Sequence, residues 1–290
     1  MTEFSEQAVR FDCEGEVLVG VVSAPAAGPA SDIGLLIVVG GPQYRVGAHR
    51  QFVELARHVA RAGYAAMRFD ARGMGDSTGE TPGFDSQTPD IEGAIQCLQA
   101  HAPSVRKVLL WGLCDGASAC AIYMADTQDP RVAGLAMLNP WIRSSESLAR
   151  SNLRHWYPRR LAQSEFWKKL LTGRVRWRAA LEVLQDGIHG LRRWGAGERA
   201  DFRSRMLEGL KTFAGVVWVH LSDKDQTARE FSDVVSSSTA WQALKRRPSV
   251  QFIPLPNADH TLSTPAARRM LEADVVRLLK QIADGERGRG

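Results

Sequence analysis

The stretch WGLCDG, whose cysteine is Cys114, combines the features of a turn that presents a nucleophile. The apolar run 107–110 before it is typical of a buried strand, and the small residues 117–121 after it would let a helix pack closely on that strand. Gly112 and Gly116 lie two positions either side of the cysteine, as in the strand–turn–helix elbow of nucleophilic enzymes. Serine is the usual residue at the tip of such a turn. The pattern therefore predicts an enzyme and leaves its chemistry open.

A cysteine nucleophile needs a base that takes its proton and an acid that orients the base. In the elbow layout the chain order is nucleophile, acid, histidine. Of the seven histidines, only His260 follows the last predicted strand in a loop, PNADH. The others lie in predicted helices, in a strand, in a basic segment or before Cys114. We therefore predict His260 as the base. The alternatives are that His260 is a solvated loop histidine and that Cys114 is an inert buried thiol.

The acid should follow the predicted strand 215–221, where the sequence SDKD supplies two carboxylates. A tight turn favours Asp225, three positions after the small Ser222, and Asp223 is the alternative. A third interpretation is that both carboxylates only cap the following helix.

The oxyanion of an acyl-transfer intermediate needs two backbone N–H donors. One is expected from Asp115, at the positive end of the helix that follows the cysteine. The second should come from the loop after the predicted strand 33–39. Pro42 has no N–H, so Gly41 is the predicted donor and Gln43 the alternative.

Apolar runs and helical periodicities alternate along most of the chain, which predicts a mostly parallel central sheet flanked by helices. We predict a hairpin first, then further strands and helices. The predicted strands are 9–13, 17–23, 33–39, 64–69, 107–110, 132–138, 215–221 and 250–255, and the predicted helices include 52–61, 89–100 and 265–282.

Residues 141–210 differ sharply in composition from the rest of the chain. They hold 15 Lys and Arg against 7 Asp and Glu, and five of the eight tryptophans. Because this segment falls between two predicted strands, we predict a helical cap inserted between two parts of an α/β core, 1–140 and 211–283. The tail 284–290 is predicted to be disordered.

The composition of the whole chain indicates a soluble globular protein, with 44% hydrophobic residues and a net charge of +5. No apolar run is long enough to span a bilayer, and the N-terminus is too polar for a signal peptide. The four cysteines show neither CxxC pairs nor metal-type spacing with histidine. We therefore expect a cytoplasmic protein with free thiols, without metal or cofactor, in which Cys13, Cys97 and Cys120 only pack.

Several motifs together make the chain similar to α/β-hydrolases, and specifically to the exosortase A system-associated hydrolase 1 family. They are GGPQYRVGAHRQF (40–52), RFDARGMGDS (68–77), WGLCDGAS (111–118), LNPW (138–141), SDKDQTAREF (222–231) and ADHTLS (258–263). The resemblance covers about residues 8–282 and implies an α/β-hydrolase fold, a structural role for the motif DARGMGDS and a link to bacterial exopolysaccharide export. Gln43 and Trp141, in two of these motifs, are candidate substrate-binding residues.

An acyl-cysteine is a thioester that can pass its acyl group to water, an alcohol, an amine or a thiol. We predict a hydrolase of esters or thioesters with the triad Cys114, His260 and Asp225, and acyl transfer as the alternative. The basic, tryptophan-rich segment favours an anionic substrate, free or bound to coenzyme A or an acyl carrier protein, although exposed arginines and a small aromatic core would give the same composition. A non-catalytic protein that binds nucleic acid or another anionic polymer is the distant alternative; no known nucleic-acid module occurs, so we expect no nucleic-acid partner.

Overall fold

The computed structural model describes residues 3–26, 28, 30–41, 43–142 and 198–287. The chain divides into two compact units, one formed by Met1–Ile142 with Arg205–Gly290 and the other by Arg143–Ser204. Only residues 198–204 of the second unit are described, and residues 143–197 of the predicted cap 141–210 lie outside the described residues. The fold and the candidate site below belong to the first unit.

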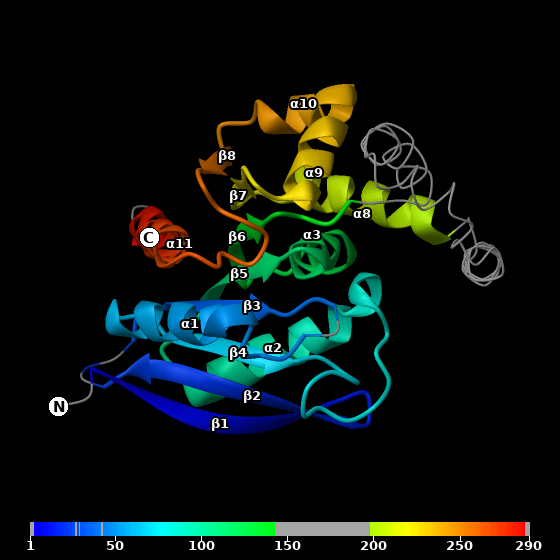
Figure 1. Cartoon of the computed structure of the whole chain (residues 1–290). Coiled ribbons are helices and arrows are strands. Elements are labelled where there is room, and N and C mark those ends of the chain that lie inside the picture. The colour runs from blue at the N-terminus through cyan, green and yellow to red at the C-terminus, as the bar shows by residue number, and fades with distance from the viewer. Residues whose placement is uncertain (1–2, 27, 29, 42, 143–197, 288–290) are drawn as a thin grey trace, which may run out of the picture. The chain divides into compact units, whose positions relative to one another are not determined.

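The described residues form one eight-stranded sheet with the strand order β1-β2-β4-β3-β5-β6-β7-β8 (Figure 1). The strands are β1 (Phe4–Cys13), β2 (Glu16–Pro25), β3 (Ile33–Val38), β4 (Ala66–Asp70), β5 (Lys107–Leu113), β6 (Val132–Leu138), β7 (Val216–Ser222) and β8 (Val250–Leu255). Strands β3 to β8 are parallel to one another, and the β1–β2 hairpin pairs antiparallel with β4 through β2. The carboxyl ends of six strands therefore meet at one edge, where ligands bind in open α/β sheets.

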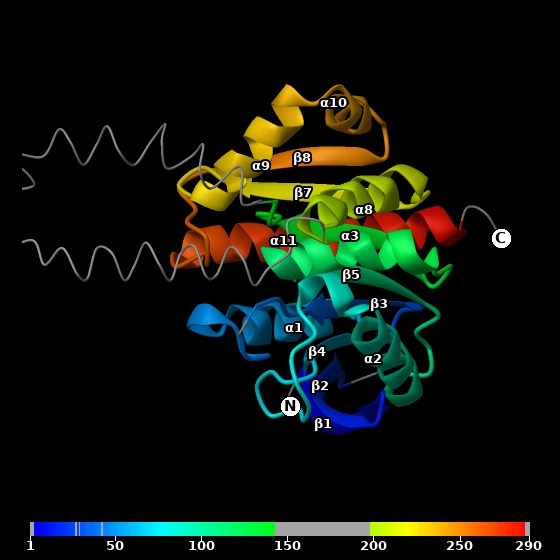
Figure 2. The same cartoon turned by 90° about the vertical axis from the view of Figure 1, so that its right-hand side faces the viewer.

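Helices cover both faces of this sheet (Figures 1 and 2). The helices are α1 (Gln51–Arg61), α2 (Thr88–His101), α3 (Asp115–Thr127), α8 (Glu198–Thr212), α9 (Gln226–Ser237), α10 (Thr239–Lys245) and α11 (Pro265–Arg287), with the 3₁₀ turns η1 (Ala48–Arg50) and η2 (Phe84–Ser86). Residues of α1 and α11 form one hydrophobic core with inward residues of β3, β5 and β6, including Phe52 and Trp111 in edge-to-face contact at 5.5 Å. Helices α2 and α3 cover the opposite face. Because both faces are covered, β3 and β4 are buried along their whole lengths.

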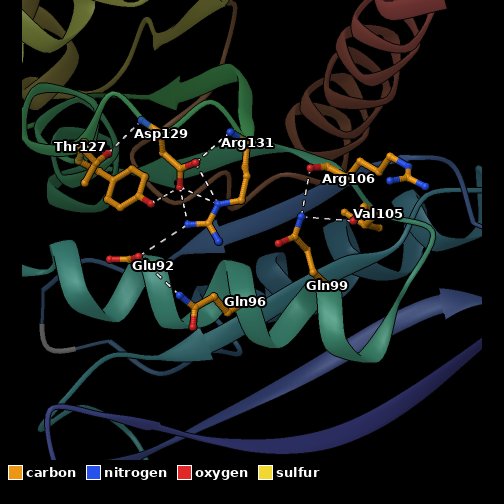
Figure 3. A network of polar contacts seen from close by, with 9 residues as sticks. Glu92, Gln96, Gln99, Val105, Arg106, Thr127, Asp129 and Arg131 are labelled. Atoms are coloured by element: carbon orange, nitrogen blue, oxygen red, sulfur yellow. Dashed lines mark hydrogen bonds and ion pairs between the residues drawn. The ribbon is translucent and has the colours of Figure 1, made fainter.

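Polar contacts secure the amino end of the parallel strands, opposite their carboxyl edge (Figure 3). The Gln99 side chain of α2 donates to the carbonyl oxygens of Val105 and Arg106, which lead into β5, at 3.3 and 3.1 Å. Arg131, at the start of β6, binds Asp129 through two nitrogens, the closest pair at 2.6 Å. These contacts hold the segments that lead into β5 and β6.

The predicted alternation of strands and helices is confirmed, and the fold is the α/β-hydrolase fold. Strands 132–138 and 250–255 have the predicted bounds, whereas β1 begins earlier than predicted because its first residues are mostly exposed and carry no apolar signal. The predicted disorder of 284–290 is wrong for its first four residues, since α11 continues through Arg287. Glu and Arg are good helix formers, and extending an existing helix costs little.

Candidate active site

Cys114 occupies the turn between β5 and α3, at the carboxyl edge of the sheet. Its backbone has φ 59° and ψ −123°, a strained conformation for a residue with a side chain. The turn is held by the Cys114 N–H, which donates to the Leu138 carbonyl at 2.9 Å, and by the Cys114 carbonyl, which accepts from the Trp141 N–H at 3.0 Å. The strand–turn–helix elbow expected from WGLCDG is present, with a partly exposed thiol at its tip.

The two glycines around Cys114 are required because backbones cross here without space for side chains. A Cβ atom on Gly112 would lie 2.4 Å from the carbonyl carbon of Gly116. A Cβ atom on Gly116 would lie 2.5 Å from the carbonyl oxygen of Val38, at the end of β3. Glycine at both positions therefore lets α3 start directly against the neighbouring strand.

Asp225 and His260 come together from the ends of β7 and β8. His260 Nδ1 donates to Asp225 Oδ2 at 2.9 Å, and Asp225 is buried whereas His260 is partly exposed. Because a carboxylate only accepts hydrogen bonds, Nδ1 must carry a proton and Nε2 is left to face the nucleophile. The Cys114 side chain is near enough to this imidazole to raise its pKa, so the three predicted catalytic residues lie together.

Asp225 also begins the next helix. It is the N-cap of α9, where Oδ1 accepts from the Thr227 N–H at 3.1 Å and Oδ2 from the Ala228 N–H at 3.2 Å. Asp223, the alternative acid, is exposed and has neither contact. The same carboxylate therefore caps the helix and binds the histidine, so the two interpretations of SDKD are not exclusive.

The pKa of His260 is strongly raised, from 6.5 to about 10. The hydrogen bond to Asp225 is the main cause, followed by the hydrogen bond to Cys114, and together they outweigh the loss of hydration. The imidazole is therefore charged at neutral pH. A charged imidazole beside Cys114 can supply the proton that a leaving group needs.

The predicted oxyanion donors lie on either side of the elbow. Asp115 is the first residue of α3, and Gly41, with φ 59°, lies in the loop after β3. The N–H of Gln43 donates to the Gly41 carbonyl at 2.7 Å. Gln43 is thus the weaker candidate, because its donor is already occupied. As a substrate-binding candidate, Gln43 lies half-buried in the same loop.

A buried carboxylate in the motif DARGMGDS anchors this loop. Asp70, at the end of β4, accepts from the Arg45 N–H at 2.6 Å and forms an ion pair with the Arg45 guanidinium. The same guanidinium contacts Asp76 at 2.8 Å, and the Asp76 N–H donates to Asp70 at 3.1 Å. The motif therefore has the structural role that the family resemblance implies, since it holds the loop that carries Gly41.

A second buried polar contact was not predicted. Asn139, at the end of β6 with φ 47°, accepts from the Ser222 N–H at 2.8 Å and donates to the Ser222 hydroxyl at 3.0 Å. It joins the segment leading to Trp141 with the turn that carries Asp225. An asparagine directly after an apolar run, in LNPW, was the available signal, since asparagine tolerates left-handed backbone. Trp141 itself is half-buried beside the elbow, and its carbonyl accepts from the Ser118 hydroxyl at 2.6 Å.

Two further findings concern only the described parts of the chain. No cluster of three His, Cys, Asp or Glu side chains there could hold a metal ion. None of the helices there has both the length and the apolar character that crossing a membrane requires.

Comparison with solved structures identifies the class of fold. The chain is similar to the esterase Pf2001 of Pyrococcus furiosus, with 14% identity, a TM-score of 0.62 and coverage of 96% of this chain and 93% of the esterase. It is also similar to Est1E of Butyrivibrio proteoclasticus, solved with ferulic acid bound, with 14% identity, a TM-score of 0.63 and coverage of 95% and 100%. An alpha-beta serine hydrolase homologue of Coxiella burnetii gives 15% identity, a TM-score of 0.57 and coverage of 93% and 96%. No curated protein matches the chain in sequence.

The sheet order and these likenesses show the α/β-hydrolase fold. The model of the family described as serine aminopeptidase, S33, matches residues 44–194, just over half of the chain. The chain therefore belongs to this hydrolase family. The family description refers to a serine enzyme, whereas this chain has Cys114 at the tip of the elbow.

Proposed function

We propose that this protein cleaves an ester or thioester with Cys114 as the nucleophile, His260 as the base and Asp225 as the acid that orients it. The 2.9 Å hydrogen bond between His260 Nδ1 and Asp225 Oδ2, on an imidazole whose pKa Cys114 also raises, is the observation that carries the proposal. The strained elbow supports it, because strain at a residue presented by a turn is typical of a functional position.

The chemistry follows from these positions. The Cys114 thiolate attacks the carbonyl carbon, a C–S bond forms, and the carbonyl π electrons move to oxygen. The oxyanion is bound by N–H groups at the helix start and in the loop after β3. When it collapses, the leaving alkoxide or thiolate takes the proton of the His260 imidazolium. Water, deprotonated by His260, then attacks the acyl-cysteine and releases the acid and the thiolate.

The substrate is proposed from sequence features. Residues 141–210 hold more Lys and Arg than Asp and Glu. This excess of positive charge supports an anionic acyl substrate, because opposite charges attract one another within about a Debye length. The similarity of the six motifs to the exosortase A system-associated hydrolase 1 family supports a substrate connected with exopolysaccharide or envelope polymers. Both are proposals about the substrate, and the proposed triad does not depend on them.

The test is to trap the acyl-enzyme. Incubation with p-nitrophenyl acetate should release a burst of p-nitrophenolate equal to the enzyme concentration, and mass spectrometry should locate the acetyl group on Cys114. Cys114→Ala should lose both signals. Cys120→Ala is the matched control, because burial raises the pKa of that thiol and it lies only six positions along the chain. An acetyl group on another residue, or an unchanged burst in Cys114→Ala, would contradict the proposal.

Iodoacetamide provides an independent measure of the thiolate. Cys114 should be alkylated first among the four thiols, because burial raises the pKa of Cys13 and Cys120, and that of Cys97 to about 11. The rate should fall in His260→Ala. Preferential labelling of Cys120, or a rate that does not depend on His260, would overturn the triad.

Acyl transfer remains the second candidate, and the cysteine is the observation that favours it, since a thioester intermediate reacts with amines and thiols as well as water. Adding an amine or thiol acceptor to the trapped acyl-enzyme separates the two. A transferase should give saturable formation of the acylated acceptor, whereas a hydrolase should release the free acid at an unchanged rate.

A further inference from the structure

The side chain of Asp115 turns toward the loop that carries Gly41. A Cβ atom on Gly40 would lie 2.3 Å from Asp115 Oδ1, and one on Gly41 would lie 3.0 Å from Oδ2. The carboxylate therefore lies directly against the backbone of these two glycines. A side chain at either position would overlap it, so Gly40 and Gly41 leave the space that the carboxylate fills.

The donors of this carboxylate are the groups that an oxyanion would need. The backbone N–H groups of Asp115, Gly116 and Gly41 lie near enough to lower the pKa of this carboxylate. The first and the last are the two predicted oxyanion donors. An N–H that is occupied by a carboxylate oxygen cannot stabilise an oxyanion on the neighbouring acyl carbon at full strength.

Charge makes the competition stronger than hydrogen bonding alone. Burial raises the pKa of Asp115, although the three N–H groups and the nearby His260 lower it in part. In its ionised form the carboxylate is an anion in a place where hydration is poor. A tetrahedral oxyanion formed a few ångströms away would be a second anion in the same poorly hydrated space, so the two repel.

We propose that Asp115 is a gate to the oxyanion site: its carboxylate occupies the site in the free enzyme and must leave before Cys114 is acylated. A substrate that does not displace it is turned over slowly, so Asp115 determines which acyl groups react. The inference rests on the proposed function, because it needs an oxyanion formed at Cys114. It adds a specificity-determining residue outside the triad.

Two reagents separate the gate from the nucleophile. Alkylation by iodoacetamide displaces iodide at a saturated carbon and forms no oxyanion, so its rate reports the thiolate alone. Acylation by p-nitrophenyl acetate passes through an oxyanion, so its burst rate reports the thiolate and the oxyanion site together. The ratio of the acylation rate to the alkylation rate therefore cancels any effect of a variant on the thiol pKa.

The ratio should rise at least about tenfold in Asp115→Ala, since the loss of a single oxyanion donor costs roughly 10²–10³ in turnover. It should rise less in Asp115→Asn, whose amide oxygen can accept the same bonds without the charge. Asp223→Ala, which removes an exposed carboxylate from the same edge of the sheet, should leave the ratio unchanged. Thermal unfolding of each variant shows that it is folded, and Asp115→Asn keeps a side chain of nearly the same size.

Contrary results have distinct meanings. Fast, His260-dependent alkylation with a ratio that stays constant or falls in both Asp115 variants would overturn the gate and leave the triad standing. Alkylation that does not depend on His260 would overturn the triad, and the gate with it.

Discussion

The turn between β5 and α3 and the turn between β7 and α9 both lie at the carboxyl edge of the sheet, and each presents one proposed catalytic side chain. Cys114 sits in the first with a left-handed φ of 59° and no side-chain cap on its helix. Asp225 sits in the second with an extended backbone, and its carboxylate caps the helix. The first turn is shaped by close backbone packing around Gly112 and Gly116, whereas the second is shaped by hydrogen bonds of one side chain.

The two turns should therefore respond to substitutions in different ways. Packing of backbone on backbone rejects any added atom and does not respond to charge or pH. An isosteric amide can replace a hydrogen-bonded carboxylate as a helix cap. The pKa of the histidine beside it nevertheless falls, because the negative charge is lost. Substitutions of the glycines around Cys114 should therefore lower stability, whereas substitution of Asp225 should mainly lower activity.

The largest effect is expected where packing is tightest. Gly116→Ala places a methyl group 2.5 Å from the Val38 carbonyl oxygen, and neither backbone can move without displacing β3 or α3. The free energy of unfolding should fall by about 3 kcal/mol or more, at the upper end of overpacking costs, and activity should be lost with it. Urea unfolding followed by circular dichroism measures the change.

The matched control is Gly285→Ala, in α11, where an added Cβ meets no atom within 4 Å. This variant should be neutral or stabilised by up to about 1 kcal/mol, because alanine favours helix over glycine. Equal losses in the two variants would mean that crowding at the elbow is not what Gly116 avoids.

The next effect tests the second turn. Asp225→Asn should keep the α9 cap, so the unfolding midpoint should change little. The turnover number should fall by roughly 10² to 10⁴, since the amide cannot hold the imidazolium or fix its tautomer. Steady-state hydrolysis of p-nitrophenyl acetate with parallel unfolding curves gives both quantities.

Asp223→Asn is the control for Asp225→Asn, because Asp223 is exposed in the same loop. Its turnover should match that of the unaltered enzyme. If Asp223→Asn proves the more damaging change, the orientation of the whole turn after β7 is misassigned.

A smaller effect should appear in the titration of His260. Nuclear magnetic resonance of the ring should show an imidazolium that persists well above pH 6.5, toward about 10. In Cys114→Ala the pKa should fall, because one of the two groups that raise it is removed, and in Asp225→Asn it should fall further. An ordinary pKa in the unaltered enzyme would show that the ion pair does not form.

The titration of His260 also determines how the stability of the protein changes with pH. Between pH 6.5 and about 10 the folded chain keeps a proton on His260 that the unfolded chain has released. This contribution to stability is complete below pH 6.5 and is lost as the pH rises toward 10. The unfolding midpoint should therefore decline over that window, and decline less in His260→Gln.

The smallest expected effect lies outside both turns. If the excess of arginine and lysine in residues 141–210 attracts an anionic substrate, acylation by a coenzyme A thioester should slow by roughly threefold to tenfold as salt is raised, because screening weakens steering. A neutral p-nitrophenyl ester should be unaffected. Arg159→Glu with Arg160→Glu should act on the charged substrate alone. Equal salt dependence for both substrates would falsify steering.

The two turns also differ in how far sequence could predict them. The position of Cys114 could be predicted from the spacing of the glycines around it. Only glycine avoids the clashes at positions 112 and 116, so the requirement is visible in the sequence itself. His260 follows from its place after the last strand. Sequence favoured Asp225 over Asp223 only weakly, because the choice depends on which carboxylate is buried, and that depends on how β7 and β8 end.

Side-chain direction accounts for most of what sequence could not reveal. Nothing in WGLCDG shows that the Asp115 carboxylate turns toward Gly41 and not toward solvent. The contact between Asn139 and Ser222 joins residues 83 positions apart, so no local pattern predicts it. The extension of α11 through Arg287 was missed because a charged, glycine-containing tail resembles a disordered one in composition.

The double duty of Asp225 has a consequence for how mutational surveys of this protein should be interpreted. A library selected only for folded, abundant protein would retain asparagine at position 225 and score the site as tolerant. The same library selected for growth on a substrate would discard it. At Gly116 the two selections would agree. Positions where abundance and activity disagree would thus mark catalytic side chains, and their agreement would mark the scaffold that carries them.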